Sequence, residues 1–148
     1  MTLLKTLQLI LIGTVAAMLA QAAFAGRLLI GDSESRLLHS VTAKVLVWLA
    51  ISQLVVVAAL WRRSAAPRWL LAASVFLLLS EVLEYSAGEL HNVALHVPLG
   101  VALFGAAIRQ LLWSLLEAAP AGKLLEISLQ RSAYSQGGVD HQSQQASK

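Results

Sequence analysis

The chain has 148 residues, of which 57% are hydrophobic and 13% are charged, with a formal net charge of +3 and no cysteine. Soluble domains are about 45 to 50% apolar and about 25% charged, so this composition is typical of a membrane protein and argues against a soluble globule. The lack of cysteine excludes disulfides, thiolate metal sites, thiol nucleophiles and covalent CxxCH haem attachment. The basic residues lie beside apolar runs, which favours a role in membrane orientation over binding of nucleic acid.

The first apolar run, residues 7–25, is long enough to cross a bilayer and follows one charge at Lys5. Its end, Ala23-x-Ala25, also fits the small-residue pattern of a signal-peptide cleavage site. We expect the run to be retained as a transmembrane helix, because more membrane sequence follows it and no exterior domain does. Cleavage, the alternative, would leave three spans.

After a polar loop at residues 26–38, the remaining apolar runs predict three more spans, at residues 39–61, 69–85 and 91–113. Pro98, near the start of the last run, favours either a first helical turn or a kink. The sequence therefore predicts an all-α, integral membrane, up-down bundle of four helices over residues 1–118. Residues 119–148 have too little apolar content to form a core and predict a disordered tail.

Lysine and arginine are distributed unequally between the two ends of these spans. One end collects Lys5, Arg62, Arg63, Arg68, Arg109, Lys123 and Arg131, and the other end has Arg27 and Arg36. Basic residues near span ends accumulate on the cytoplasmic side. We therefore expect both termini to be cytoplasmic.

His39 and His96 are candidate ligands of a haem iron. Ionisable residues within membrane spans are costly, and each is a site hypothesis by default. The two histidines open spans that run in the same direction, and counting about 1.5 Å per residue places them at similar heights. Imidazole is a common axial ligand of haem, and an apolar helical bundle can hold the macrocycle between its helices.

Small residues one turn after each ligand favour the same pair. A porphyrin lying against a helix needs space there, and Ala43 follows His39 by four residues, as Gly100 follows His96. His91 is followed at the same spacing by a bulky leucine. We therefore predict a b-type haem held by His39 and His96 and lying against Ala43 and Gly100.

A second group of polar residues, at the same end of the bundle, predicts a polar network. Glu81 and Glu84 are three residues apart and share a helix face. Lys44 lies at about the height of His96, and His91 is nearby in sequence. We favour an ion pair from Lys44 to Glu81 or Glu84 over the alternative, a proton relay or an acid that orients a histidine.

Three segments resemble a known family. The strings AGRLLIGD, LLHSVTAKVLVWLA and ALHVPLGVALFGAAIRQLLW resemble small bacterial four-helix membrane proteins of unknown function. That arrangement is similar to one half of the haem A synthase bundle, in which histidines on the second and fourth helices of each half face a haem. The resemblance spans residues 7–115, and it implies that His39 and His96 are the matching histidines.

The sequence departs from the synthase beside the first ligand. The synthase commonly has a basic residue after the histidine and an acid three residues before it, where this chain has Ser40 and Arg36. The resemblance therefore implies haem binding without synthase chemistry. No serine-nucleophile motif, phosphate-binding glycine loop or HExxH pattern occurs, so we expect no stand-alone enzyme.

Together these features predict a multi-pass protein of the bacterial inner membrane that binds b-type haem for electron transfer or haem handling. Its expected partners are the lipid bilayer and other membrane subunits or redox proteins. The alternative is a cofactor-free structural or accessory subunit whose His, Glu and Lys side chains form a buried network.

Overall fold

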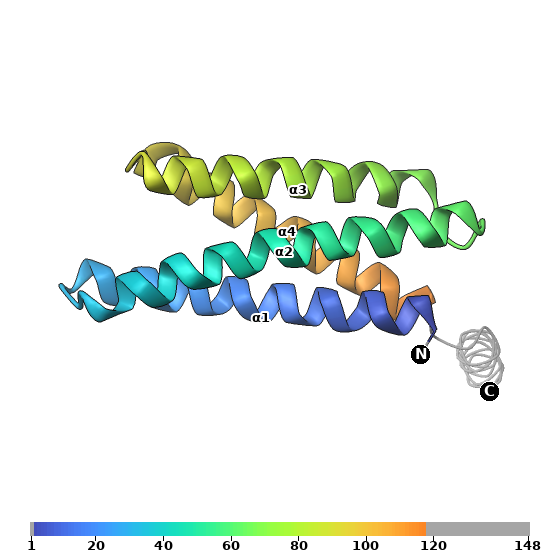
Figure 1. The fold of residues 1–148 in the computed structure, drawn as a ribbon, viewed down its shortest axis with the longest axis horizontal. Coiled ribbons are helices and arrows are strands. Elements are labelled where there is room, and N and C mark those ends of the chain that lie inside the picture. The colour runs from blue at the N-terminus through green and yellow to red at the C-terminus, as the bar shows by residue number, and fades with distance from the viewer. Residues whose placement is uncertain (1, 118–148) are drawn as a thin grey trace, which may run out of the picture. The chain divides into compact units, whose positions relative to one another are not determined.

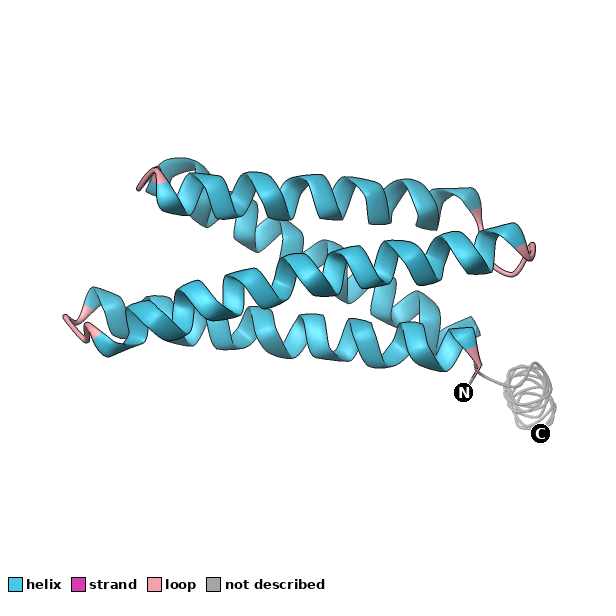
Figure 2. Cartoon of the chain, in the orientation of Figure 1, coloured by secondary structure: helices cyan, strands magenta, loops and turns pink. Residues whose placement is uncertain are grey.

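The computed structural model describes residues 2–117, which form four helices: α1 (Leu3–Leu29), α2 (Glu34–Arg62), α3 (Arg68–Glu89) and α4 (Val93–Glu117). Consecutive helices run in opposite directions, and α4 crosses behind α2 from the end of α3 toward the start of α1 (Figure 1). Only short turns separate the helices in this part of the chain (Figure 2). The all-α prediction is confirmed, and the predicted tail at 119–148 lies outside the described residues. All contacts given below lie within one compact unit that ends at Ser114.

Each of the four helices is long and apolar enough to cross a membrane. They extend beyond the predicted spans at most ends, and the polar loop expected at residues 26–38 shortens to residues 30–33. This part of the prediction was wrong because polar residues at a helix end do not stop the helix. Their backbone groups still need hydrogen-bond partners, and continuing the helix supplies them.

The first three helices end in the same way, with one residue in the left-handed conformation: Gly31 (φ 89°), Ser64 (φ 55°) and His91 (φ 55°). The amide of the next residue then bonds to a carbonyl five residues back, at 3.1 Å after α1, 3.0 Å after α2 and 2.9 Å after α3. These bonds are those of the Schellman motif, in which glycine is preferred at the left-handed position. Ser64 and His91 therefore carry a backbone cost of about 1 kcal/mol each.

His91→Gly should stabilise the protein by up to about 1 kcal/mol, because glycine adopts the left-handed conformation without a steric penalty. Gly31→Ala should destabilise it by a similar amount. The measurement is the free energy of unfolding, obtained by titrating each purified variant with a denaturing detergent. A lower stability of His91→Gly would contradict the assigned turn geometry.

Asp32 fixes the turn between α1 and α2. Its carboxylate accepts hydrogen bonds from the Ser35 hydroxyl at 2.9 Å, the Arg27 Nε at 2.7 Å and the Glu34 amide at 3.1 Å. The bond from Ser35, together with the Arg27 charge, holds the pKa of Asp32 below its usual value. This contribution to stability is therefore present above the unfolded-state pKa and is lost as the pH falls through the folded-state pKa.

Two apolar clusters pack the interior of the bundle, one on each side of a polar layer. The first contains Met18, Leu46, Ala50, Leu77, Leu103 and Ala107. The second contains Leu7, Leu11, Val57, Leu60 and Leu70. Between them along the helices, the buried side chains of Gln53, Ser74 and Gln110 join α2, α3 and α4.

The polar layer is held by hydrogen bonds between α2, α3 and α4, and within residues 2–117 its atoms Gln53 Oε1 and Gln110 Nε2 have no partner. Gln53 Nε2 donates to Gln110 Oε1 at 2.7 Å and to Ser74 Oγ at 3.1 Å. The Ser74 hydroxyl lies 2.9 Å from the Leu70 carbonyl and 3.2 Å from Gln110 Oε1.

Gln110→Leu should destabilise the bundle by about 1 kcal/mol, because interhelical hydrogen bonds in membrane proteins contribute roughly 0.6 to 1.7 kcal/mol. The substitution keeps the side-chain volume but removes the acceptor for Gln53 and Ser74. Ser52→Ala is the matched control, since Ser52 is exposed and bonds to the Trp48 carbonyl of its own helix. Equal unfolding free energies for the two variants would show that the layer contributes no stability.

Candidate cofactor-binding site

A cavity of about 520 Å³ lies at the end of the bundle that carries the α1–α2 and α3–α4 turns. This volume is within the range of about 300 to 1,000 Å³ typical of small-molecule sites. Apolar residues of α1, α2 and α4 form most of its wall, and α3 contributes Glu81, Glu84 and Tyr85. The polar side chains in the wall are Gln21, His39, Glu81, Glu84, Tyr85 and His96.

His39 and His96 meet at this cavity. Their ring centroids are 6.0 Å apart, and the ring planes are inclined by 68°. His39 lies in the second turn of α2 and His96 in the first turn of α4, where the Asn92 side chain accepts a hydrogen bond from the Leu95 amide at 3.2 Å. The two helix starts therefore bring the histidines to one height, as their spacing along the spans predicted.

Glu84 orients the imidazole of His96. The Nδ1 atom of His96 lies 3.0 Å from Glu84 Oε1 and 3.1 Å from the Glu84 backbone carbonyl. A carbonyl oxygen can only accept a hydrogen bond, so the Nδ1 atom carries the proton. The Nε2 atom is consequently left as the nitrogen that can bind a metal.

Two glycines provide the space for this pair. A Cβ atom at Gly88 would lie 3.1 Å from Cε1 of His96, and one at Gly100 would lie 2.9 Å from Oε1 of Glu84. Gly100 lines the cavity as expected, but the close contact at its missing side chain is with Glu84. The proximity of Gly88 to His96 depends on how α3 and α4 cross, which the sequence of either helix alone does not specify.

Unpaired polar atoms concentrate around the cavity. Within residues 2–117, six buried side-chain oxygen or nitrogen atoms have no hydrogen-bond partner. Four of them belong to cavity residues: Gln21 Oε1, His39 Nδ1, Glu81 Oε1 and Glu84 Oε2. Because buried polar groups are normally paired, these four atoms remain available to hydrogen-bond with water or a ligand in the cavity.

The structure separates the predicted residues into two groups. His39, His96, Ala43, Gly100, Glu81 and Glu84 all line the cavity. Lys44 does not, and its side chain is exposed. In the described part of the chain, the ion pairs within 4.0 Å are Arg27–Asp32 and His96–Glu84, so the expected pair from Lys44 to a glutamate is not formed.

Lys44 and His91 do not join the predicted polar network at the cavity, and the physical reason differs between them. Lys44 directly follows Ala43, and consecutive helical residues point about 100° apart, so both cannot face the cavity. His91 occupies the left-handed position of the α3–α4 turn and is exposed there. Gln21, which the sequence did not indicate as a site residue, is a lone amide in an apolar run and brings α1 into the site.

Among residues 2–117, no group of three or more His, Cys, Asp or Glu side chains is placed to hold a metal ion. The wall of the cavity contains two imidazole side chains, those of His39 and His96.

No protein-family model, curated protein or solved structure matches the chain. The similarity to one half of the haem A synthase bundle is therefore neither supported nor refuted, and a function must be argued from the cavity and its residues.

Proposed function

We propose that this chain is a four-span protein of the bacterial inner membrane that binds b-type haem between His39 and His96, for electron transfer or haem handling. The observation that supports this most is the 6.0 Å separation of the two imidazoles at the wall of an apolar cavity. The two rings come from different helices and lie at the same apolar cavity, so His39 and His96 are the residues that would hold the iron.

The residues around the histidines have distinct roles in this proposal. His39 and His96 would hold the iron, and Glu84 would keep the proton of His96 on Nδ1, as partners of metal-bound histidines commonly do. The apolar walls exclude water and surround the macrocycle. When bound, the haem supplies reversible one-electron chemistry. Other membrane subunits or redox proteins would exchange electrons or haem with this site.

Glu84→Ala should weaken haem binding about 10- to 100-fold, the usual effect of removing the partner of a metal-bound histidine. Glu89→Ala is the matched control, because Glu89 is an exposed carboxylate on the same helix and does not line the cavity. Haem titration of the apoprotein in detergent measures both affinities. Equal affinities would mean that Glu84 does not act through His96.

The orientation in the membrane is part of the same proposal. With both termini in the cytoplasm, reporter fusions after Pro67 and after Lys123 should report the cytoplasm, and a fusion after Ser33 should report the exterior. The physical reason is the accumulation of basic residues at the cytoplasmic ends of the spans. An exterior signal after Pro67 would reverse the orientation.

The alternative function is that of a cofactor-free accessory subunit. The observation that favours it is the His96–Glu84 pair, which is already formed between α3 and α4. In that case His39→Ala and Glu81→Ala would change stability or assembly with other subunits, and the purified protein would carry no haem. The haem content of protein purified from haem-replete cells separates the two functions.

A further inference from the structure

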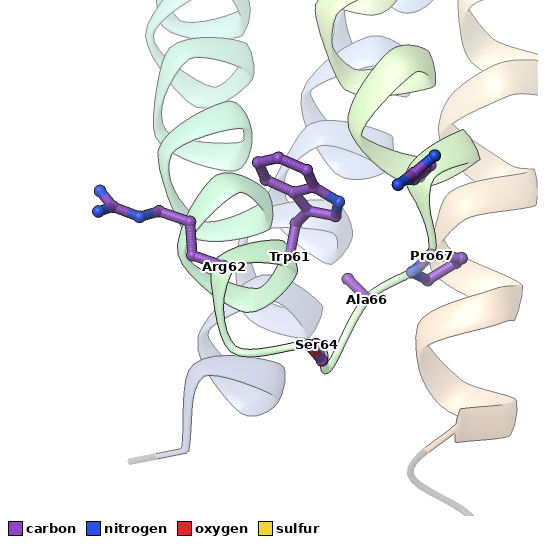
Figure 3. A pocket seen from close by; sticks show the side chains of 6 residues that line it. Trp61, Arg62, Ser64, Ala66 and Pro67 are labelled. Carbon is purple, nitrogen blue, oxygen red and sulfur yellow. The ribbon is translucent and has the colours of Figure 1, made fainter.

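A second cavity, of about 570 Å³, lies at the turn between α2 and α3 and is largely open at the surface. It lies at the other end of α2 from His39, roughly 35 Å away at 1.5 Å per residue. Its lining residues are Trp61, Arg62, Ser64, Ala66, Pro67 and Arg68. Figure 3 shows Trp61 projecting between α2 and α3 above the turn, and Arg62 projecting away from it.

The sequence of the α2–α3 turn is strongly basic. The segment 61–69 contains three arginines, Arg62, Arg63 and Arg68, and no acidic residue. Among residues 2–117, the ion pairs within 4.0 Å involve Arg27 and His96, not these three arginines. Such a cavity favours an anion, and the guanidinium group is suited to the geometry of phosphate oxygens.

The position of the cavity, at the ends of two helices that can cross a membrane, indicates which anion it would meet. Two helices that are each long and apolar enough to cross a membrane meet at this turn. Trp61 and Trp69 stand on either side of it, and tryptophan is enriched at the level of lipid headgroups. Basic pockets between helices on the cytoplasmic side are suited to anionic lipid headgroups.

We infer that the cavity at the α2–α3 turn binds the phosphodiester headgroup of an anionic phospholipid. Arg68 and the Ser64 hydroxyl lie in the cavity wall, and Arg62 is exposed, so its flexible side chain can turn toward a headgroup beside it. This inference rests on the membrane placement in the proposed function, but it is independent of haem.

The test is native mass spectrometry of the full-length protein in detergent, titrated with phosphatidylglycerol or with phosphatidylcholine of the same acyl chains. The double variant Arg62→Gln/Arg68→Gln should bind phosphatidylglycerol about 25-fold more weakly, because each basic residue near a headgroup contributes about fivefold. Arg62→Lys/Arg68→Lys keeps the charge and should retain most of the affinity. Phosphatidylcholine should bind weakly to all forms.

Arg63→Gln is the matched control, since Arg63 lies in the same exposed turn but does not line the cavity. An equal loss in Arg63→Gln and in the double variant, or equal binding of the two lipids, would overturn the inference. Displacement of the lipid by millimolar inorganic phosphate would also overturn it and assign the cavity to free phosphate. None of these outcomes affects the haem content, so failure here is distinguishable from failure of the haem proposal.

Discussion

Replacing either His39 or His96 with alanine should abolish a low-spin, bis-histidine haem spectrum. A haem with a single protein ligand becomes high-spin or is lost, and the described cavity wall contains no third histidine to replace the missing one. Each variant should therefore lose the spectrum fully, not in part. The measurement is the visible absorption of the purified variants in their oxidised and reduced forms.

His91→Ala is the control for this experiment. It also removes an imidazole near the α3–α4 turn, but His91 is exposed and does not line the cavity. Its spectrum should match that of the unmodified protein. If His91→Ala lost the spectrum while His39→Ala kept it, the assigned pair of ligands would be wrong.

Gly88→Val should also reduce the haem content severely, although it leaves both ligands in place. The new Cβ atom would lie 3.1 Å from Cε1 of His96, and the two methyl groups of valine extend farther. The imidazole must then move away from Glu84 or α3 must separate from α4. We expect most of the bound haem to be lost, measured as haem per protein after purification.

Gly105→Val is the matched control, because a Cβ atom at Gly105 meets no atom within 4 Å. Both substitutions place a β-branched residue in a helix, so their intrinsic effects on helix formation are similar. Equal haem contents in the two variants would show that the contact between Gly88 and His96 does not determine binding.

Much of the fold was predictable because each helix needs about 20 apolar residues to cross a bilayer, and residues 2–117 contain four such runs. The proximity of His39 to His96 was predictable from their similar heights together with the small residues Ala43 and Gly100, one turn after each. The helix ends were not, because a polar residue at the end of a span fits a loop and a last helical turn equally well. Residues 26–29 and 34–38, which were predicted as part of a loop, are examples, because they form the last turn of α1 and the first turn of α2.

Side-chain direction was the harder part of the site. Lys44 had a suitable height beside the glutamates but the wrong rotation about α2, and its side chain is exposed. Gln110 directly follows Arg109 near a span end, yet it points inward and bonds to Gln53 at 2.7 Å. These orientations depend on the crossing of the helices, which the apolar pattern of single spans does not specify.

The most direct test of the haem proposal is the absorption spectrum of the full-length protein, purified in detergent from haem-replete cells. We predict a low-spin b-type spectrum with one haem per chain, lost in the His39→Ala/His96→Ala double variant. A colourless protein, or a haem spectrum that is unchanged in the double variant, would contradict the proposal.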